Sequence, residues 1–207
     1  MNVGATTVAG SYKTCYGDYF AWGEATPRYA SITRTSASDA SFTWKSDYSS
    51  GYSSSKYPSY TDNTLDAEHD AATANWGGSW RTPTLAEFNA LMKACSSSDN
   101  NKQTPVELTG TIVSGGIYWL SSTQAIEPFY TGSAGLLFVS ASDISKRIFF
   151  PAAGNVYNKT LNGERGIYWS STYYNTPSAY SLWFYSSSVH PDYNARFNGF
   201  SIRPVSD

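Results

Sequence analysis

The chain has 207 residues, and its 14 Lys and Arg against 16 Asp and Glu give a formal net charge of −2. This balance argues against nucleic-acid binding, because affinity for phosphates depends on a basic surface. No apolar run approaches the roughly 20 residues of a membrane-spanning helix, so we expect no membrane insertion. Only 14% of the residues are charged and 16% are aromatic, which favours short strands and loops and fits secreted or surface proteins.

The first third of the chain has short strand-like pieces and little periodicity. Residues 19–22 favour a strand, because glycines punctuate both ends of the apolar run. Residues 31–62 are rich in Ser, Thr and Tyr and predict a long irregular excursion, which is uncommon in a domain unless it is functional or mobile. The first residues lack the pattern of a signal peptide. No linker divides the sequence, so we expect a single domain over residues 1–207.

Two helices are predicted between residues 67 and 94. Asp66 provides an N-cap for a helix at 67–75, whose acidic start suits the positive end of the helix dipole. For the second helix, Thr84 and Glu87 have the spacing of a capping box, and an apolar stripe follows with spacings of three and four residues. We place this helix at 85–94 and expect a polar loop at 96–102.

Strands are expected in the second half of the chain, at residues 109–113, 117–120, 136–139, 148–150, 167–170, 181–185 and 200–204. Pro151 ends one of them, because Pro cannot donate a hydrogen bond to a ladder. The sequence GIYW occurs at 116–119 and again at 166–169. Two copies are too few for a solenoid, so we interpret them as a pseudo-symmetric pair of hairpins within one sheet system.

The cysteine content leaves two alternatives open. Cys15 and Cys95 are the only cysteines of the chain. They allow one disulfide or two buried thiols, and their spacing does not decide between these. They form neither a metal-binding pair nor a redox C-x-x-C motif.

The sequence gives little support for catalysis or metal binding. The motifs of α/β-hydrolases, zinc proteases and phosphate-binding loops do not occur. The acidic residues at 66, 68 and 70 are conceivable cation ligands, but helix capping explains them better. Asp143 and Glu164 are conceivable as the paired carboxylates of a glycosidase, although nothing in the sequence aims them at each other. We therefore expect no catalytic residue, no metal site and no cofactor.

Residues 166–205 interleave apolar positions with many polar-tipped aromatic ones. Because side chains alternate along a strand, Leu182 and Phe184 are expected on one side. The other side would then present Ser181, Trp183, Tyr185 and Ser187 to solvent. Tyr and Trp offer contact area with few rotors to immobilise, and Ser and Asn offer adaptable hydrogen bonds, as in antibody paratopes. A single Tyr is more simply explained as part of a core, but so many in one segment favour a binding surface.

Seven blocks of the sequence carry a resemblance to a known family. They are NVGA at 2–5, YGDYFAWGE at 16–24, DAATANWGG at 70–78, WRTPT at 80–84, PAAG at 151–154, YWSS at 168–171 and GFSIRPV at 199–205. These blocks span nearly the whole chain in order and resemble the bacterial major-paralogous-domain (FISUMP-type) proteins of gut Bacteroidetes surfaces and their phages. The resemblance implies an α+β, C-type-lectin-like fold of the formylglycine-generating-enzyme branch. The catalytic cysteines of that enzyme would lie late in the chain, and none follows Cys95, so a binding protein is implied and not an oxidase.

The C-terminal segment also resembles the variable region of diversity-generating-retroelement proteins. In those systems the adenines of a template copy are replaced at random, so an Asn codon AAC becomes any codon ending in C. The residues that arise exclude Lys, Glu, Gln, Met and Trp, and residues 185–198 contain none of these five. The resemblance implies nine varied positions: Tyr185, Ser187, Ser188, His190, Asp192, Tyr193, Asn194, Ala195 and Phe197. Trp183 falls outside this rule, and Arg196 would be a fixed anchor.

We therefore expect residues 166–205 to bind a protein or glycan receptor outside the cell, at the cell surface or on a virion. The expected ligand-binding residues are Tyr173, Tyr174, Asn175, Tyr180, Ser181, Trp183, Tyr185, Ser187, Ser188, His190, Asp192, Tyr193, Asn194, Arg196 and Phe197. Two alternatives stay open, a structural surface or fimbrial subunit and a carbohydrate-active enzyme. Concentration-dependent polymers would indicate the first, and turnover lost on replacing one carboxylate would indicate the second.

Overall fold

The computed structural model describes residues 1–8, 10–34, 40–44, 63–95, 110–123, 125–126, 129–130, 132–157, 160–175 and 177–207. Within these ranges, regular structure consists mostly of antiparallel strands with three helices. The expected α+β class is confirmed at this level. The expectation of two helices is wrong, because Tyr12–Cys15 forms an additional helix of four residues, α1.

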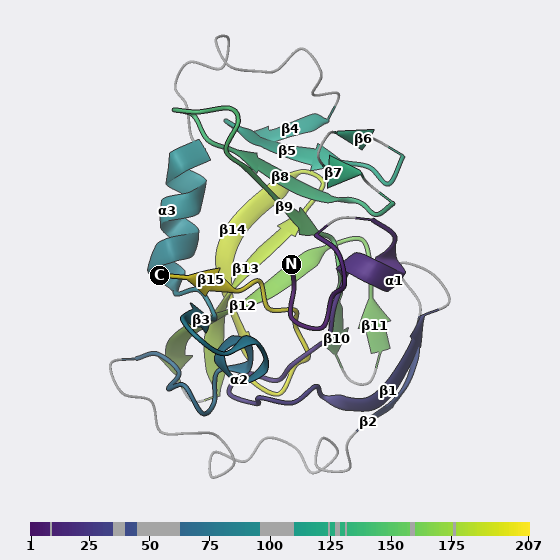
Figure 1. Ribbon diagram of the computed structural model, residues 1–207, viewed down its shortest axis with the longest axis vertical. Helices are drawn as coiled ribbons and strands as arrows, with labels where there is room; N and C mark the ends of the chain where they lie inside the picture. The colour runs from purple at the N-terminus through teal and green to yellow at the C-terminus, as the bar shows by residue number, and fades with distance from the viewer. Residues whose placement is uncertain are drawn as a thin grey trace.

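A three-stranded antiparallel sheet runs through the middle of the molecule (Figure 1). Its strands are β12 (Gly166–Asn175), β13 (Ser178–Tyr185) and β14 (Ser188–Ala195), in that order, so β14 is an edge strand. The predicted strands at 167–170 and 181–185 are confirmed and are longer than expected. The segment around His190, where the sequence predicts no strand, is also a strand, because residues 188–195 pair with β13 without a break. Pro191 is tolerated there because an edge strand does not need every N–H group.

The second sheet has four antiparallel strands and packs on the first. It comprises β4 (Thr111–Ser114), β5 (Ile117–Leu120), β8 (Gly135–Val139) and β9 (Arg147–Pro151). The predicted strands at 117–120, 136–139 and 148–150 are confirmed. The two GIYW copies fall in β5 and β12, which belong to separate sheets, so the expectation of one sheet system is wrong. The sheets share a core in which the rings of Phe150 and Tyr168 meet edge-on at 5.1 Å.

Helix α3 (Leu85–Cys95) lies along both sheets and confirms the prediction for 85–94 within one residue. Its capping box is formed as expected. The backbone N–H of Glu87 donates to Thr84 Oγ1 at 3.2 Å, and the backbone N–H of Thr84 donates to Glu87 Oε2 at 2.8 Å. Phe88 is buried on the face that contacts the strands.

Helix α2 (Ala71–Trp76) is shorter than expected, and its cap is Asp70. Asp70 is buried and accepts hydrogen bonds from the backbone N–H groups of Ala72 and Thr73. It also accepts from both the N–H and the hydroxyl of Thr82, at 2.8 and 2.7 Å. The prediction of Asp66 as the cap is wrong, because residues 67–69 form a turn in which Asp66 bonds to His69.

The predicted strand at 200–204 is not a regular strand. Its residues are buried and form single bridges to several segments, among them Phe20 and Tyr168. Only Val205–Ser206 is a strand, β15, which pairs with β3 (Trp80–Arg81). Of the predicted strand at 19–22, only Phe20 has a β-bridge. The chain from 199 to 203 therefore connects several segments and does not belong to one sheet.

Three small antiparallel hairpins complete the described part of the chain. They are β1 (Tyr29–Arg34) with β2 (Ala40–Trp44), β6 (Ala125–Ile126) with β7 (Phe129–Tyr130), and β10 (Asn155–Tyr157) with β11 (Thr160–Asn162). The first hairpin corrects the expectation of an irregular excursion at 31–62 for the residues that it covers. Residues 35–39 and 45–62 of that excursion, and the loop expected at 96–102, lie outside the described residues.

The sequence blocks that carry the family resemblance bond to one another in the interior. The indole N–H of Trp22 donates to the carbonyl of Ser170, and that of Trp169 donates to the carbonyl of Phe20, both at 2.8 Å. The amide of Asn2 donates to the hydroxyl of Tyr168 at 3.2 Å, and this hydroxyl donates to the carbonyl of Pro151 at 2.6 Å. The segments thus joined are far apart in the sequence and form one buried network.

Of the two alternatives for the cysteines, the structure has two free buried thiols. Cys15 Sγ lies 3.2 Å from Ser133 Oγ. Cys95 is the last residue of α3, where burial raises the pKa of its thiol to about 11. Such a thiol is protonated at neutral pH and is a poor nucleophile.

Candidate binding surface

The hairpin of β13 and β14 separates buried from exposed side chains as the strand period requires. Leu182 and Phe184 are fully buried on one face, whereas Tyr185 is 38% exposed on the other and Trp183 is partly exposed. Residues that pair directly across an antiparallel ladder share a face. Trp183 pairs with His190, and Tyr185 pairs with Ser188. The outward face at this end of the hairpin is therefore aromatic and polar.

Three of these outward side chains form a group that we call the indole cluster, Trp183, Tyr185 and His190. The Trp183 ring meets the Tyr185 ring at 5.1 Å between centroids and the His190 ring at 5.0 Å. Ser188 Oγ lies 3.2 Å from His190 Nδ1. Because the rings support one another and Trp183 also packs against the core, the cluster presents preformed contact area.

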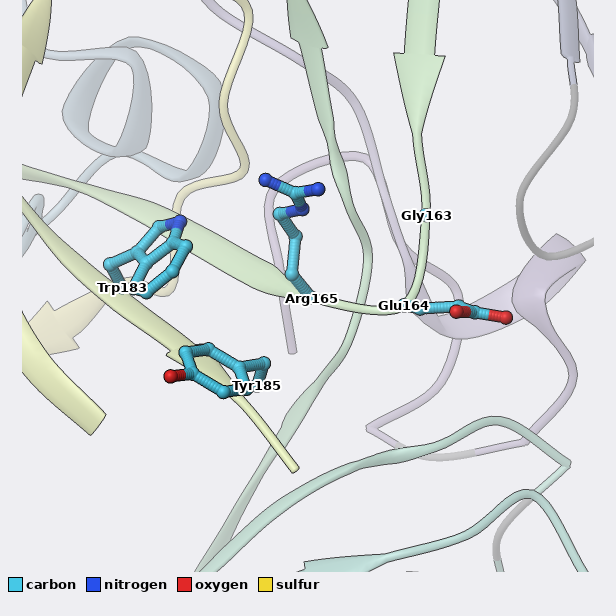
Figure 2. A pocket seen from close by; sticks show the side chains of 5 residues that line it. All are labelled: Gly163, Glu164, Arg165, Trp183 and Tyr185. Carbon is cyan, nitrogen blue, oxygen red and sulfur yellow. The ribbon is translucent and has the colours of Figure 1, made fainter. Parts of the chain in front are cut away.

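A pocket of about 340 Å³ adjoins the indole cluster. Trp183 and Tyr185 line it from β13, and Gly163, Glu164 and Arg165 line it from the turn before β12. In Figure 2 the Arg165 side chain extends beside the Trp183 ring, with its guanidinium away from the Tyr185 ring, and the Glu164 side chain points away from both rings. Glu164 has a φ of 61°, so this turn holds a non-glycine residue in the left-handed region, which is uncommon.

A second aromatic group lies on the opposite face of the same hairpin, and we call it the tyrosine cluster, Tyr174, Tyr180 and Tyr193. The Tyr174 ring stacks on Tyr193 at 4.2 Å and meets Tyr180 edge-on at 5.0 Å. Tyr180 pairs with Tyr193 across the ladder and is three residues from Trp183, so the two clusters face opposite ways. The structure thus divides the expected single patch into two.

The fifteen predicted residues differ in exposure. The exposed ones are Tyr174, Asn175, Tyr185, Ser187 and Tyr193. The partly exposed ones are Tyr173, Tyr180, Trp183, Ser188, His190, Asp192, Asn194 and Phe197. The buried ones are Ser181 and Arg196.

Two of the predicted residues do not face solvent. The expectation that Ser181 faces solvent is wrong. Ser181 is fully buried, and the Asn194 amide donates to Ser181 Oγ at 3.0 Å. Arg196 is only 2% exposed, and its guanidinium carbon lies 5.3 Å from the Trp22 ring centre and 5.6 Å from that of Tyr173. Cation–π contacts of this kind are strongest away from water. Arg196 therefore holds the end of β14 to the core.

The carboxylates considered for catalysis or metal binding have local roles. Asp143 accepts from the backbone N–H and the hydroxyl of Ser145, and these bonds keep the pKa of Asp143 below its usual value. In the described part of the chain, no three His, Cys, Asp or Glu side chains gather as a metal site would require. No helix among the same residues is long and apolar enough to span a membrane.

Sequence reasoning missed Arg165 as a member of the surface. Arg165 directly precedes β12 and lines the same pocket as Trp183 and Tyr185. The strand predicted from the sequence begins at Ile167, so the prediction includes neither Arg165 nor the turn before it.

Comparison with known proteins gives a family match for part of the chain. The model of a family described as "Domain of unknown function (DUF8237)" matches residues 137–205, about a third of the sequence. The matched region runs from β8 through β14 to β15. It includes both aromatic clusters and the pocket. No curated protein and no solved structure matches the chain.

Proposed function

We propose that this chain is a non-catalytic ligand-binding protein that displays a diversified surface on its C-terminal hairpin. The fold would be a C-type-lectin-like variant of the formylglycine-generating-enzyme branch, in a protein of the FISUMP type that a retroelement diversifies. The ligand would be a receptor, a protein or a glycan, met outside the cell, at its surface or on a virion. The buried network that joins the resembling sequence blocks supports this proposal.

One observation carries the proposal, the exposure to solvent, full or partial, of the nine positions expected to vary. None of Tyr185, Ser187, Ser188, His190, Asp192, Tyr193, Asn194, Ala195 and Phe197 is buried. Between and beside them, Phe184, Arg196 and Asn198 are buried. Substitutions at exposed positions away from special contacts usually change stability by less than about 0.5 kcal/mol. Variation at these positions would therefore cost the fold less than variation at the buried positions between and beside them.

The pairing of β14 supports the same division. All eight of its residues pair with β13, so backbone hydrogen bonds, which do not depend on side-chain identity, hold the strand in place. Pro191 on the edge and the buried Arg196 after the strand fix its course. Varied side chains on β14 would then be presented in a constant geometry.

A library displayed on yeast tests this proposal. The nine positions are randomised to the residues that codons ending in C encode, and a control library randomises nine buried positions of β8, β9, β12 and β13 in the same way. We expect most members of the first library to be displayed in folded form and to resist protease, and few members of the control. Equal loss of folding in both libraries would refute the proposal.

The neighbouring DNA and a pair of matched variants provide a second test. We expect a near-copy of the end of the gene, differing at adenines, close to a reverse transcriptase gene. Once a receptor is selected, Tyr193→Ala should weaken binding by about 2 kcal/mol. Tyr157→Ala should leave binding unchanged, because Tyr157 is equally exposed (53% against 52%) but lies on β10. Assembly into polymers at rising concentration would instead support a structural subunit.

A further inference from the structure

We infer that the pocket beside the indole cluster binds an acidic sugar, a pyranose ring that carries a carboxylate. This inference rests on the proposed function and names a ligand class for one part of its surface. It depends on three features of the pocket: a cation that has no acidic partner among the described residues, two aromatic rings and a small open volume.

Arg165 supplies the cation. It follows residues 163–164 and lines the same pocket as Tyr185. Among the described residues, no carboxylate lies within ion-pair distance of Arg165. Glu164 is the acidic residue of the pocket lining, and its side chain points away from the rings (Figure 2). A guanidinium offers a fork of donors that matches a carboxylate, so the pocket favours an anion of this shape.

Trp183 and Tyr185 supply the apolar contact. The faces of aromatic rings are electron-rich, and the weakly positive C–H groups on one face of a pyranose ring pack against them. Ser188 lies beside Tyr185, and His190 lies beside Trp183. Their hydroxyl and imidazole groups can donate and accept hydrogen bonds, which suits the hydroxyl groups of a sugar.

The volume of the pocket favours a single ring. About 340 Å³ is at the lower end of the range for small-molecule sites. An Asp or Glu side chain of a protein ligand would also bring a carboxylate, but on a flexible stem without a flat face for the two rings. An acidic sugar presents the carboxylate and the flat face together, so the pocket matches it better.

The test uses sodium glucuronate and N-acetylneuraminate as acidic probes and glucose as the neutral one, with saturation-transfer NMR and calorimetry on the full chain. For ligands of this size we expect at least one acid to bind with a Kd on the order of 1 mM, about tenfold tighter than glucose. Arg165→Gln should remove this preference, because one charge-assisted bond corresponds to about tenfold in affinity. Arg165→Lys should retain part of it, and Tyr185→Ala should weaken every sugar that binds.

Arg147→Gln is the matched control, because Arg147 lies on β9 outside the pocket lining. It should leave sugar binding unchanged, and thermal unfolding should show that every variant is folded. If neither acid binds better than glucose, or if Arg165→Gln keeps the preference, the inference is wrong. The yeast library is independent of this result, so its success would retain the binding surface while the acidic sugar is rejected.

Discussion

Replacing two neighbours on β13, Phe184 and Tyr185, separately by Ala measures the division between core and surface. Phe184 is fully buried, its ring stacks on Tyr168 with 5.9 Å between centroids, and it belongs to the core that α3 and both sheets share. Tyr185 is 38% exposed, and its described ring contact is with Trp183. The two side chains have nearly the same size, so they differ chiefly in their surroundings.

The expected losses differ by several fold. A buried Phe→Ala substitution costs about 3–5 kcal/mol, because the lost burial and the cavity add. Tyr185→Ala loses one aromatic contact of about 0.5–1.5 kcal/mol and a ring that is already partly in water. We therefore expect Phe184→Ala to lower the free energy of unfolding by about 4 kcal/mol and Tyr185→Ala by about 1 kcal/mol.

Urea denaturation followed by circular dichroism measures both values. With an m-value of about 3 kcal/mol/M, the midpoint should fall by about 1.3 M for Phe184→Ala and by about 0.3 M for Tyr185→Ala. A change in m would indicate that the unfolded or native state itself has changed, so m must stay constant for the comparison. Equal losses for the two variants would contradict the assignment of Tyr185 to a replaceable surface.

Three further predictions concern the scaffold. Asp70→Ala should lower the free energy of unfolding by about 3 kcal/mol in urea denaturation, since it leaves buried donors of α2 and Thr82 without an acceptor; Asp70→Asn, which keeps one oxygen, should lose less. Hydrogen bonds from Arg81 lower the pKa of Glu87 from 4.5 to about 2, so this carboxylate stabilises the fold above pH 4.5 and the contribution is lost as the pH falls toward 2. Solvent screening limits it to about 1 kcal/mol, and a plot of unfolding free energy against pH should be flatter in this range for Glu87→Gln. Gly166→Ala places a Cβ 2.0 Å from the Phe184 ring and should lower the free energy of unfolding by about 3 kcal/mol. Thermal unfolding of the double variant Gly166→Ala, Phe184→Leu should show a loss of stability smaller than the sum of the losses of the two single variants, because the smaller Leu leaves room for the new methyl group.

The parts of the fold that the sequence predicts are those with local determinants. The extent of α3 follows from the Thr84–Glu87 capping box and an apolar stripe, both of which involve only neighbours in the sequence. The strands β5, β8 and β9 are short apolar runs that two packed sheets bury. Local determinants do not predict where α2 begins, because Asp66 and Asp70 are equally good N-caps when only their sequence neighbours are considered. The bonds from Thr82, twelve residues on, favour Asp70.

The arrangement of the candidate surface depends on strand pairing and on a bulge, and neither can be predicted from amino-acid composition. The sequence of β14, SVHPDYNA, is polar and includes Pro, so neither periodicity nor propensity indicates a strand. Backbone pairing with β13 forms it. A bulge in β12 between Trp169 and Tyr173 shifts the register there. Together these features place Tyr174 beside Tyr180 and Tyr193, and away from Trp183.

The alternation along β14 places most of the positions proposed to vary on one of the two faces. Tyr185, Ser188, His190, Asp192 and Asn194 lie on the face of the indole cluster, since they occupy or pair with the odd-numbered positions of β13. Tyr193 and Ala195 pair with even-numbered positions and lie on the face of the tyrosine cluster. Five of the nine positions proposed to vary therefore lie on the pocket face. Because β14 is an edge strand, a ligand bound along that edge would also reach Tyr193. Variation at β14 would then change mainly the side chains next to the pocket, while Trp183 and Arg165 stay constant within it.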